Sequence, residues 1–203
     1  MTYHPQFFSP ITSQSVRNCL DRFVLIKPFI EEGSTLLDLG CSEGWFSFSF
    51  SYICKQVLGI DMESELVNGN NTLRKEHGIK NIRFEQDNVS KLFKTPQSHS
   101  YDTILYMSTH HHVIQAHDNH KEILRNISQS GKQMFFDCGQ KSEGCTDYGW
   151  WKKLPETDDC EQWVKNYLEE NTVYKTVEKI GASLVHGVPR YLFRAYNGTN
   201  TDI

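Results

Sequence analysis

The sequence feature that most constrains the fold is a pair of apolar runs, each closed by small or acidic residues: LLDLGCSEG at 36–44 and VLGID at 57–61. Gly40 and Gly44 let the backbone approach a ligand closely, and Asp61 is placed to accept hydrogen bonds from ribose hydroxyls. Their spacing differs from the Gly-x-Gly-x-x-Gly that cradles a dinucleotide pyrophosphate. The pattern predicts two buried parallel strands and a site for a ligand that has an adenosine but no phosphate to bind.

The remaining apolar segments alternate between strand and helix periodicity. We expect strands at 35–39, 56–60, 81–84, 102–106 and 132–136, and helices at 13–30, 45–53, 63–76, 119–128 and 160–168. Two more strands, at 176–180 and 191–196, form an antiparallel C-terminal edge pair. This order predicts a Rossmann-like α/β fold, with a central, mostly parallel seven-stranded sheet and helices on both faces.

A length of 203 residues favours a single domain, 1–203. Within it we expect a helical cap at 1–33, a cofactor-binding core at 34–137, a substrate loop or lid at 138–160, and a helix with edge strands at 161–197. Apolar residues make up 38% and charged residues 23%, which is enough for a globular core and argues against wholesale disorder.

Several absences in the sequence bear on location and partners. No apolar run reaches the roughly 18 residues of a membrane helix, and the N-terminus lacks the layout of a signal peptide. The six cysteines include no Cys-x-x-Cys pair, which is typical of reduced thiols. We therefore expect a cytoplasmic protein without a membrane span. A net charge of −4 argues against sequence-independent binding to nucleic acid, although it is compatible with a local basic patch.

The glycine segment and Asp61 resemble the class I S-adenosylmethionine-dependent methyltransferases. The resemblance implies S-adenosyl-L-methionine as cofactor and S-adenosyl-L-homocysteine as product. It implies that the 40–44 loop holds the methionine part, that Asp61 binds the ribose, that 86–89 contacts the adenine and that Arg22 meets the carboxylate. The cofactor-binding residues predicted in this way are Arg22, Asp38, Gly40, Cys41, Ser42, Gly44, Trp45, Asp61, Met62, Asp87, Asn88 and Met107.

A closer resemblance is to the methyltransferase domain of the bifunctional kinase–methyltransferases that terminate bacterial O-antigen chains. It is carried by Cys19-x-x-Arg22-x-x-Leu25-Ile26, by GWFSFSF after the glycine loop, by THHHVIQAH at 109–117 and by the segment 187–190. A weaker similarity runs to the RNA methylphosphate-capping methyltransferases, which share the upstream arginine and the closing strand. Both groups methylate a terminal phosphate, which makes a phosphate a candidate acceptor.

Three consecutive histidines follow the fourth expected strand, where ligands of open α/β sheets bind. Such rings can be structural, can act in acid–base or substrate contacts, or can bind a metal. Adjacent histidines project in different directions and no carboxylate pair sits at ligand spacing, so we predict no metal. His111 and His112 match paired histidines of the O-antigen relatives and are predicted to be catalytic. His110, His117, Trp151 and Arg190 are predicted to bind substrate.

The acceptor decides what these side chains must do. A phosphate oxygen is already anionic, whereas a hydroxyl needs a base. The histidines are therefore either a base or part of a cationic clamp, and Arg190 suits the clamp because guanidinium binds phosphate bidentately. We expect O-methylation of a phosphate or sugar hydroxyl on a small molecule or glycan, with His111, His112 and Arg190 meeting in one pocket. An RNA 5′-phosphate, a small-molecule nitrogen and a fold that only binds stay open as alternatives.

Overall fold

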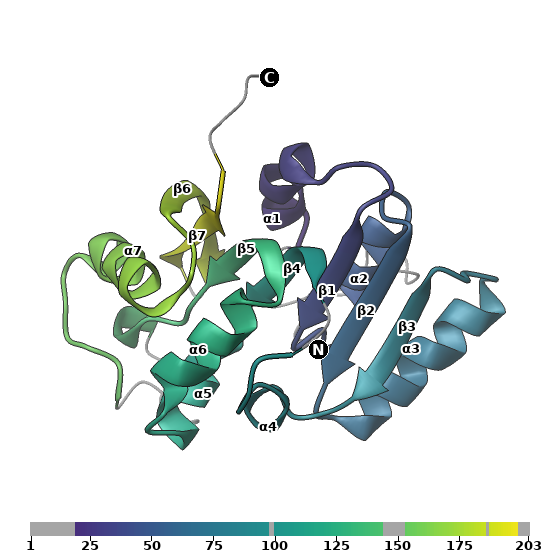
Figure 1. Ribbon diagram of the computed structural model, residues 1–203, viewed down its shortest axis with the longest axis horizontal. Helices are drawn as coiled ribbons and strands as arrows, with labels where there is room; N and C mark the ends of the chain where they lie inside the picture. The colour runs from purple at the N-terminus through teal and green to yellow at the C-terminus, as the bar shows by residue number, and fades with distance from the viewer. Residues whose placement is uncertain (1–18, 98–99, 144–152, 186, 199–203) are drawn as a thin grey trace.

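A computed structural model describes residues 19–97, 100–143, 153–185 and 187–198. Its core is a seven-stranded sheet in the order β3-β2-β1-β4-β5-β7-β6 (Figure 1). The strands are β1 Thr35–Leu39, β2 Gln56–Asp61, β3 Ile82–Gln86, β4 Tyr101–Met107, β5 Gly131–Asp137, β6 Thr176–Val185 and β7 Val188–Tyr196. Pairing is parallel from β3 to β5 and antiparallel on both sides of β7. The mostly parallel sheet and its antiparallel C-terminal pair are thus confirmed.

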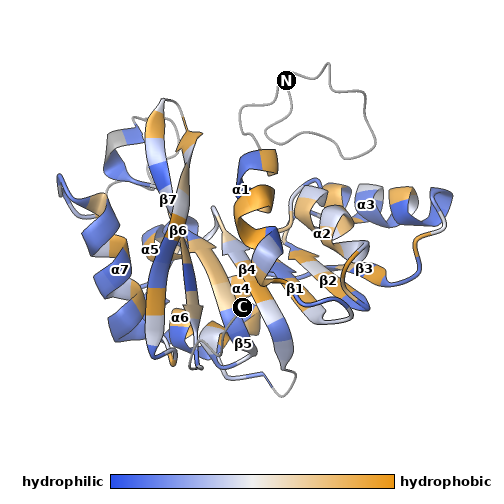
Figure 2. Cartoon of the chain, turned by 90° about the horizontal axis from the view of Figure 1, so that it is seen from above, coloured by the Kyte–Doolittle hydropathy of each residue, from blue (hydrophilic) through white to orange (hydrophobic). Residues whose placement is uncertain are grey.

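The helices cover both faces of this sheet. They are α1 Cys19–Ile26, α2 Trp45–Ser51, α3 Ser64–Glu76, α4 Val89–Leu92, α5 His110–Ala116, α6 His120–Ser128 and α7 Cys160–Asn171, with short 3₁₀ turns at Lys27–Phe29 and Lys141–Glu143. One apolar cluster packs α1, α2 and α3 on one face, and another packs α4 to α7 on the other. Figure 2 shows hydrophilic residues along much of α3 and α7, which leaves their apolar residues for the sheet.

Two helices were not expected from the sequence, and one of them changes the histidine prediction. No helix was expected between the fourth strand and residue 119, but α5 begins at His110. Buried Val113 and Ile114 anchor this short helix in the core, and such tertiary packing outweighs weak local propensity. The other unexpected helix, α4, begins after Asn88, whose side chain accepts hydrogen bonds from the N–H groups of Ser90 and Lys91.

The remaining differences concern the ends of the chain and the expected lid. Of the expected helix at 13–30, the structure describes α1 and the 3₁₀ turn, and 13–18 lie outside the described residues. The expected lid at 138–160 is described only at 138–143 and 153–160. Strands β6 and β7 are longer than expected, because they continue to a tight turn that contains Gly187 at φ 79°. Among the described residues, no helix has the length and apolar character of a membrane span.

Candidate functional site

The turn after β1 is held in place by backbone geometry that requires glycine. The N–H groups of Gly40 and Cys41 both donate to the carbonyl of Ile60, at 2.8 and 3.0 Å, which ties the turn to β2. Gly40 has φ 74°, and a Cβ there would lie 2.2 Å from Oγ1 of Thr109. A side chain at position 40 is therefore excluded both by its backbone conformation and by the start of α5.

Asp61 joins this turn to the end of β2. Its Oδ2 accepts a hydrogen bond of 2.8 Å from the N–H of Ser42, and its Oδ1 accepts one of 3.0 Å from the N–H of Glu63. Its backbone carbonyl accepts from the N–H of Asp87, which places the end of β3 beside it. The carboxylate is thus fixed between two loops, which a group that orients a ligand requires.

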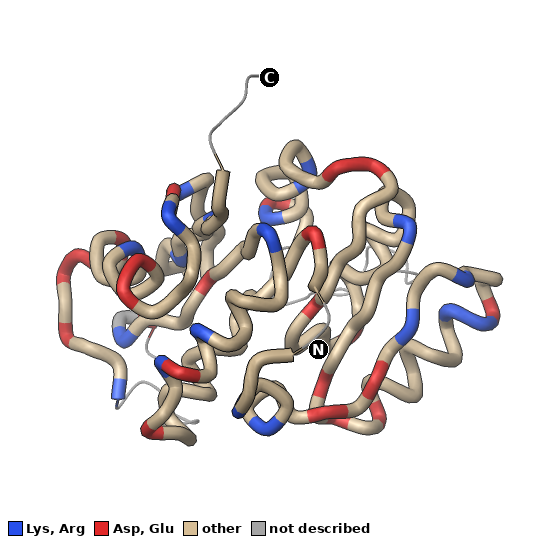
Figure 3. Tube along the Cα trace, viewed as in Figure 1, with Lys and Arg blue, Asp and Glu red and all other residues tan. Residues whose placement is uncertain are grey.

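A cavity of about 470 Å³ opens beyond the carboxyl ends of β1 to β4. The predicted cofactor residues that line it are Gly40, Ser42, Asp61, Met62, Asp87, Asn88 and Met107. Its described wall also contains the acid Glu63 but no lysine or arginine. Figure 3 shows the acidic segments at the lower ends of β2 and β3. The cavity therefore suits a ligand with many hydroxyl and amine donors better than a polyanion.

Four other predicted cofactor residues line a smaller hollow of about 20 Å³ next to this cavity. They are Arg22, Asp38, Cys41 and Trp45, and Gly40 and Met107 line both spaces. Gly44 lines neither. It caps α2 at φ 72°, where a Cβ would lie 3.1 Å from both Asn70 and Phe48, so its role in this structure is close packing.

Asp38 is buried at the end of β1 and accepts a hydrogen bond of 2.6 Å from Oγ of Ser47. Burial raises the pKa of Asp38 to about 6, against the lowering effect of the Ser47 hydrogen bond. The carboxyl of Asp38 is therefore tied to Ser47 of α2, and Asp38 lines the small hollow together with Arg22.

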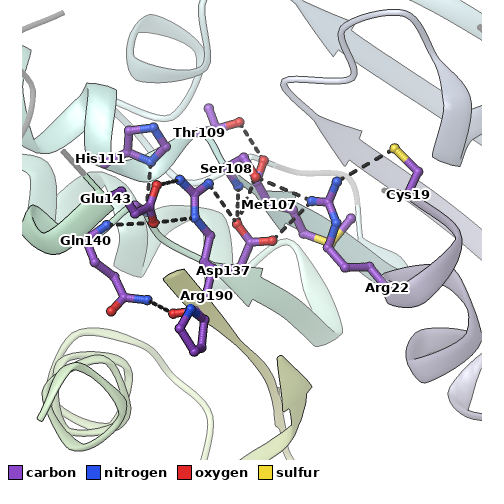
Figure 4. Close-up of polar contacts among 12 residues, drawn as sticks. Cys19, Arg22, Met107, Ser108, Thr109, His111, Asp137, Gln140, Glu143 and Arg190 are labelled. Atoms are coloured by element: carbon purple, nitrogen blue, oxygen red, sulfur yellow. Dashed lines mark hydrogen bonds and ion pairs between the residues drawn. The ribbon is translucent and has the colours of Figure 1, made fainter. Parts of the chain in front are cut away.

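A buried ionic network lies behind two residues that line these spaces, Arg22 and Ser108 (Figure 4). Asp137, at the end of β5, accepts from Nη1 of Arg22 at 3.1 Å and lies 3.6 Å from Nη1 of Arg190. Both the N–H and the hydroxyl of Ser108 donate to Asp137 Oδ1 at 2.8 Å. Arg190 in turn holds Glu143 bidentately through Nε, at 2.8 Å, and Nη2. Four charged side chains from α1, β5, the 138–143 segment and β7 are thereby joined without exposure to solvent.

Sequence reasoning missed Asp137, Glu143 and Ser108. Asp137 resembles Asp61 in that it is an acid at the carboxyl end of a buried strand. A search of the sequence for acids in that position could have found it. Glu143 and Ser108 carry no such signal, because their partners are 47 and 29 residues away in the chain.

Arg22, which is predicted to meet the cofactor carboxylate, lines the small hollow. Its guanidinium is buried and paired with Asp137, and it also lies over the ring of Phe46. Within the described part of the chain, its Nε is a buried donor without a hydrogen-bond partner. Buried donors of this kind are costly unless a ligand or water meets them.

The three consecutive histidines have three different environments. His110 is fully buried between the hydroxyls of Tyr106, at 3.1 Å, and Tyr167, at 2.9 Å. Burial lowers the pKa of His110 to about 3. The structure places His110 in the core and not in the described wall of the large cavity, because successive helical residues turn by about 100°. The predicted substrate role of His110 has no support from this position.

His111 and His112 lie on the other side of α5. Nδ1 of buried His111 accepts a hydrogen bond of 3.1 Å from the N–H of Gly139, and its ring lies 4.2 Å from that of His112. His112 lines the large cavity, as does His117. Burial, and then the positive charge of Arg190, lower the pKa of His112 below its usual 6.5. His112 is the member of the predicted catalytic pair that reaches the cavity.

Arg190 and Trp151 complete the predicted substrate residues. Trp151 lies outside the described residues. Arg190 is 1% exposed and is not part of the described wall of the large cavity. In this structure Glu143 occupies the guanidinium edge that was expected to hold a phosphate. The described residues contain no group of three or more His, Cys, Asp or Glu placed to hold a metal ion.

Comparison with known proteins agrees with this architecture. A family model described as a methyltransferase domain matches residues 30–181. The O-antigen chain terminator bifunctional methyltransferase/kinase WbdD of Escherichia coli is 22% identical, over 96% of this chain and 27% of that protein. An uncharacterized methyltransferase of Bacillus subtilis, YcgJ, is 28% identical over 50% of this chain and 40% of that protein. The chain spans about a quarter of the length of the WbdD protein it matches.

Solved structures show the same fold. A structure of WbdD has a TM-score of 0.79 at 20% identity, covering 97% of this chain and 40% of that one. A SAM-dependent methyltransferase from Aquifex aeolicus has a TM-score of 0.58 at 19% identity, covering 87% of this chain and 88% of that one.

Proposed function

We propose that this chain, which belongs to the methyltransferase-domain family and is an S-adenosylmethionine-dependent enzyme, methylates an oxygen. The proposed acceptor is a sugar hydroxyl of a glycan or small molecule. The observation that carries this proposal is the wall of the large cavity, where the glycine turn, Asp61 and His112 face one space. Similarity to a protein named as an O-antigen chain terminator supports a glycan as the acceptor.

The residues present fit the cofactor. Asp61 offers carboxylate oxygens at the cavity wall for ribose hydroxyls, and Asp87 and Asn88 stand beside it for the adenine. The buried Nε of Arg22 offers a donor toward the hollow for the methionine carboxylate. S-adenosylmethionine supplies a methyl group on a positively charged sulfur. The acids of the described wall favour that positive charge over a polyanionic RNA end.

In the proposed reaction, the side chains of the protein position the acceptor and remove its proton. His112 is held neutral near pH 7 by its lowered pKa, so one ring nitrogen is free of a proton and able to accept one from a hydroxyl. The ring of His111 packs against that of His112 at a tilt of 41° and accepts a hydrogen bond from Gly139, so His111 is a positioning residue for that ring. Positioning is the leading requirement of an in-line displacement.

A phosphate is the second candidate acceptor. It is favoured by the positive charge of Arg190, which acts at the cavity wall because it lowers the pKa of His112. For Arg190 to bind a phosphate directly, Glu143 must first leave its guanidinium, since the two are joined by two hydrogen bonds. A hydroxyl acceptor needs no such displacement.

The cofactor assignment is tested by calorimetry with S-adenosylhomocysteine. Asp61→Ala removes the ribose acceptors and is expected to weaken binding by about 1–3 kcal/mol. Glu85→Gln, an exposed change on β3, is the matched control and leaves affinity unchanged. Equal affinity in the wild type and Asp61→Ala contradicts the assignment.

The acceptor is tested by the pH dependence of methyl transfer from labelled cofactor to sugars, sugar phosphates, RNA ends and small amines. With a hydroxyl acceptor, the rate is steady near pH 7 and falls as the pH drops through the lowered pKa of His112, because the protonated ring cannot act as a base. We expect His112→Ala to lower the rate about 100-fold, and exposed His77→Ala to leave it unchanged. A rate that does not fall with acidification and that survives in His112→Ala indicates a phosphate.

A further inference from the structure

A second cavity, of about 410 Å³, lies on the face of the sheet covered by α6 and α7. It is formed by α7, the start of α6 and the 153–155 segment. Ile114 of α5 forms part of its wall, whereas Val113 and Ala116 of the same helix line the large cavity. The two spaces therefore border one seven-residue helix.

Aromatic rings form the floor of this second cavity. Trp163 and Tyr167, one turn apart on α7, have ring centroids 5.5 Å apart. The Tyr167 hydroxyl is bonded to Nε2 of His110, at 2.9 Å, and to Nδ1 of His120, at 2.6 Å. The ring of His120 also stacks on Tyr167 at 16°. The floor is thus fixed before any ligand arrives, which lowers the ordering cost of binding.

The rim carries more positive than negative charge. Lys121 and Lys153 line the cavity, together with one acid, Glu170. Asp118 lies 3.2 Å from Lys153, but the Asp118 side chain is fully exposed. Exposed ion pairs contribute only about 0–1 kcal/mol, so a ligand anion can replace Asp118 at little cost. Asn166 adds an exposed amide: its Oδ1 accepts a hydrogen bond of 2.7 Å from Gln162, and its amide nitrogen can donate to a ligand.

We propose that this cavity binds a sugar ring that carries an acidic group. The ring stacks on Trp163, the acidic group lies between Lys121 and Lys153, and Asn166 bonds to hydroxyls. Aromatic floors with polar rims suit sugars because the faces of a sugar ring are apolar and its edge is not. We assign this site to a neighbouring sugar unit of the acceptor glycan, and that assignment rests on the proposed function. The binding of an acidic sugar as such does not depend on the proposed function.

The test is saturation-transfer NMR and calorimetry with three probes: glucose 6-phosphate, glucuronate and methyl glucoside. We expect the two acidic sugars to bind and the neutral one to bind at least about tenfold more weakly, as loss of a charged contact requires. Binding of glucose 6-phosphate alone, or of glucuronate alone, identifies the acidic group. Trp163→Ala and Lys121→Gln are each expected to weaken binding about tenfold. Tyr52→Ala and Lys80→Gln, exposed changes elsewhere, leave binding unchanged.

Two results overturn the proposal. One is that none of the three probes binds, and the other is that binding is the same in Trp163→Ala and Lys121→Gln as in the wild type. Trp163→Phe keeps an aromatic floor and should retain most of the affinity, which separates loss of stacking from loss of folding. S-adenosylhomocysteine binding, measured on the same samples, is expected to be unchanged by Trp163→Ala. Failure of the wild type to bind S-adenosylhomocysteine counts against the proposed function and leaves the sugar result standing.

Discussion

The glycine turn at the large cavity and the ionic network behind it are built in different ways. The turn is local: Gly40 and Asp61 are 21 residues apart, and backbone N–H groups of the turn donate hydrogen bonds to the end of β2. The ionic network around β5 and β7 joins Arg22, Asp137, Glu143 and Arg190 through buried side-chain contacts. The turn depends on backbone conformations that few residue types adopt, and the network depends on each buried charge having a partner of opposite charge.

The largest effect is expected in the ionic network. Asp137→Asn keeps the shape of the side chain but leaves Arg22 and Arg190 without the shared carboxylate, so we expect a loss of about 3–5 kcal/mol in the free energy of unfolding. Urea denaturation measures it. The control is Glu169→Gln, which breaks an exposed pair with Lys165 and should cost no more than about 1 kcal/mol. A loss in Asp137→Asn no larger than in the control would show that the network contributes little to stability.

A smaller effect is expected in the glycine turn, and Gly33 of the same chain serves as the control. Gly33 and Gly40 have nearly the same φ, 76° and 74°, but nothing lies within 4 Å of a Cβ at Gly33. Gly33→Ala therefore reports backbone strain alone, of about 1 kcal/mol. Gly40→Ala adds the collision with Thr109, and we expect its loss of unfolding free energy to exceed that of Gly33→Ala by about 1–3 kcal/mol. Equal losses would mean that the turn moves freely away from α5.

The third effect is a change in the slope of stability with pH, and it separates His110 from His112. The pKa of His110 is lowered to about 3, so its contribution to stability is full above the unfolded-state value of 6.5 and is lost as the pH falls. One such group gives a slope of at most about 1.4 kcal/mol per pH unit between these values. We expect His110→Gln to flatten the unfolding free energy between pH 6 and 4, and His112→Gln to change it less. Equal slopes in both variants would contradict the assignment of His110 to the core.

The cofactor half of the site was predictable because its signals are short in range. The strand, the glycine turn and the acid at the end of the next strand follow one another within 36–61. The turn needs glycine for its backbone conformation, and the acid is recognised by its position at a strand end. The ligand roles of these residues stay predictions that the calorimetry must test. The fold class could be predicted for the same reason, since alternating strands and helices admit few sheet orders.

The acceptor half depended on the tertiary structure. The sequence by itself determined that three histidines follow β4, and it could not determine that they begin a helix and so face the core, Gly139 and the cavity in turn. It supplied Arg190 as a candidate phosphate ligand, and only packing brought Glu143 and Asp137 to that guanidinium. The physical reason is that buried charges are paired by whatever the fold brings within reach, irrespective of distance along the chain.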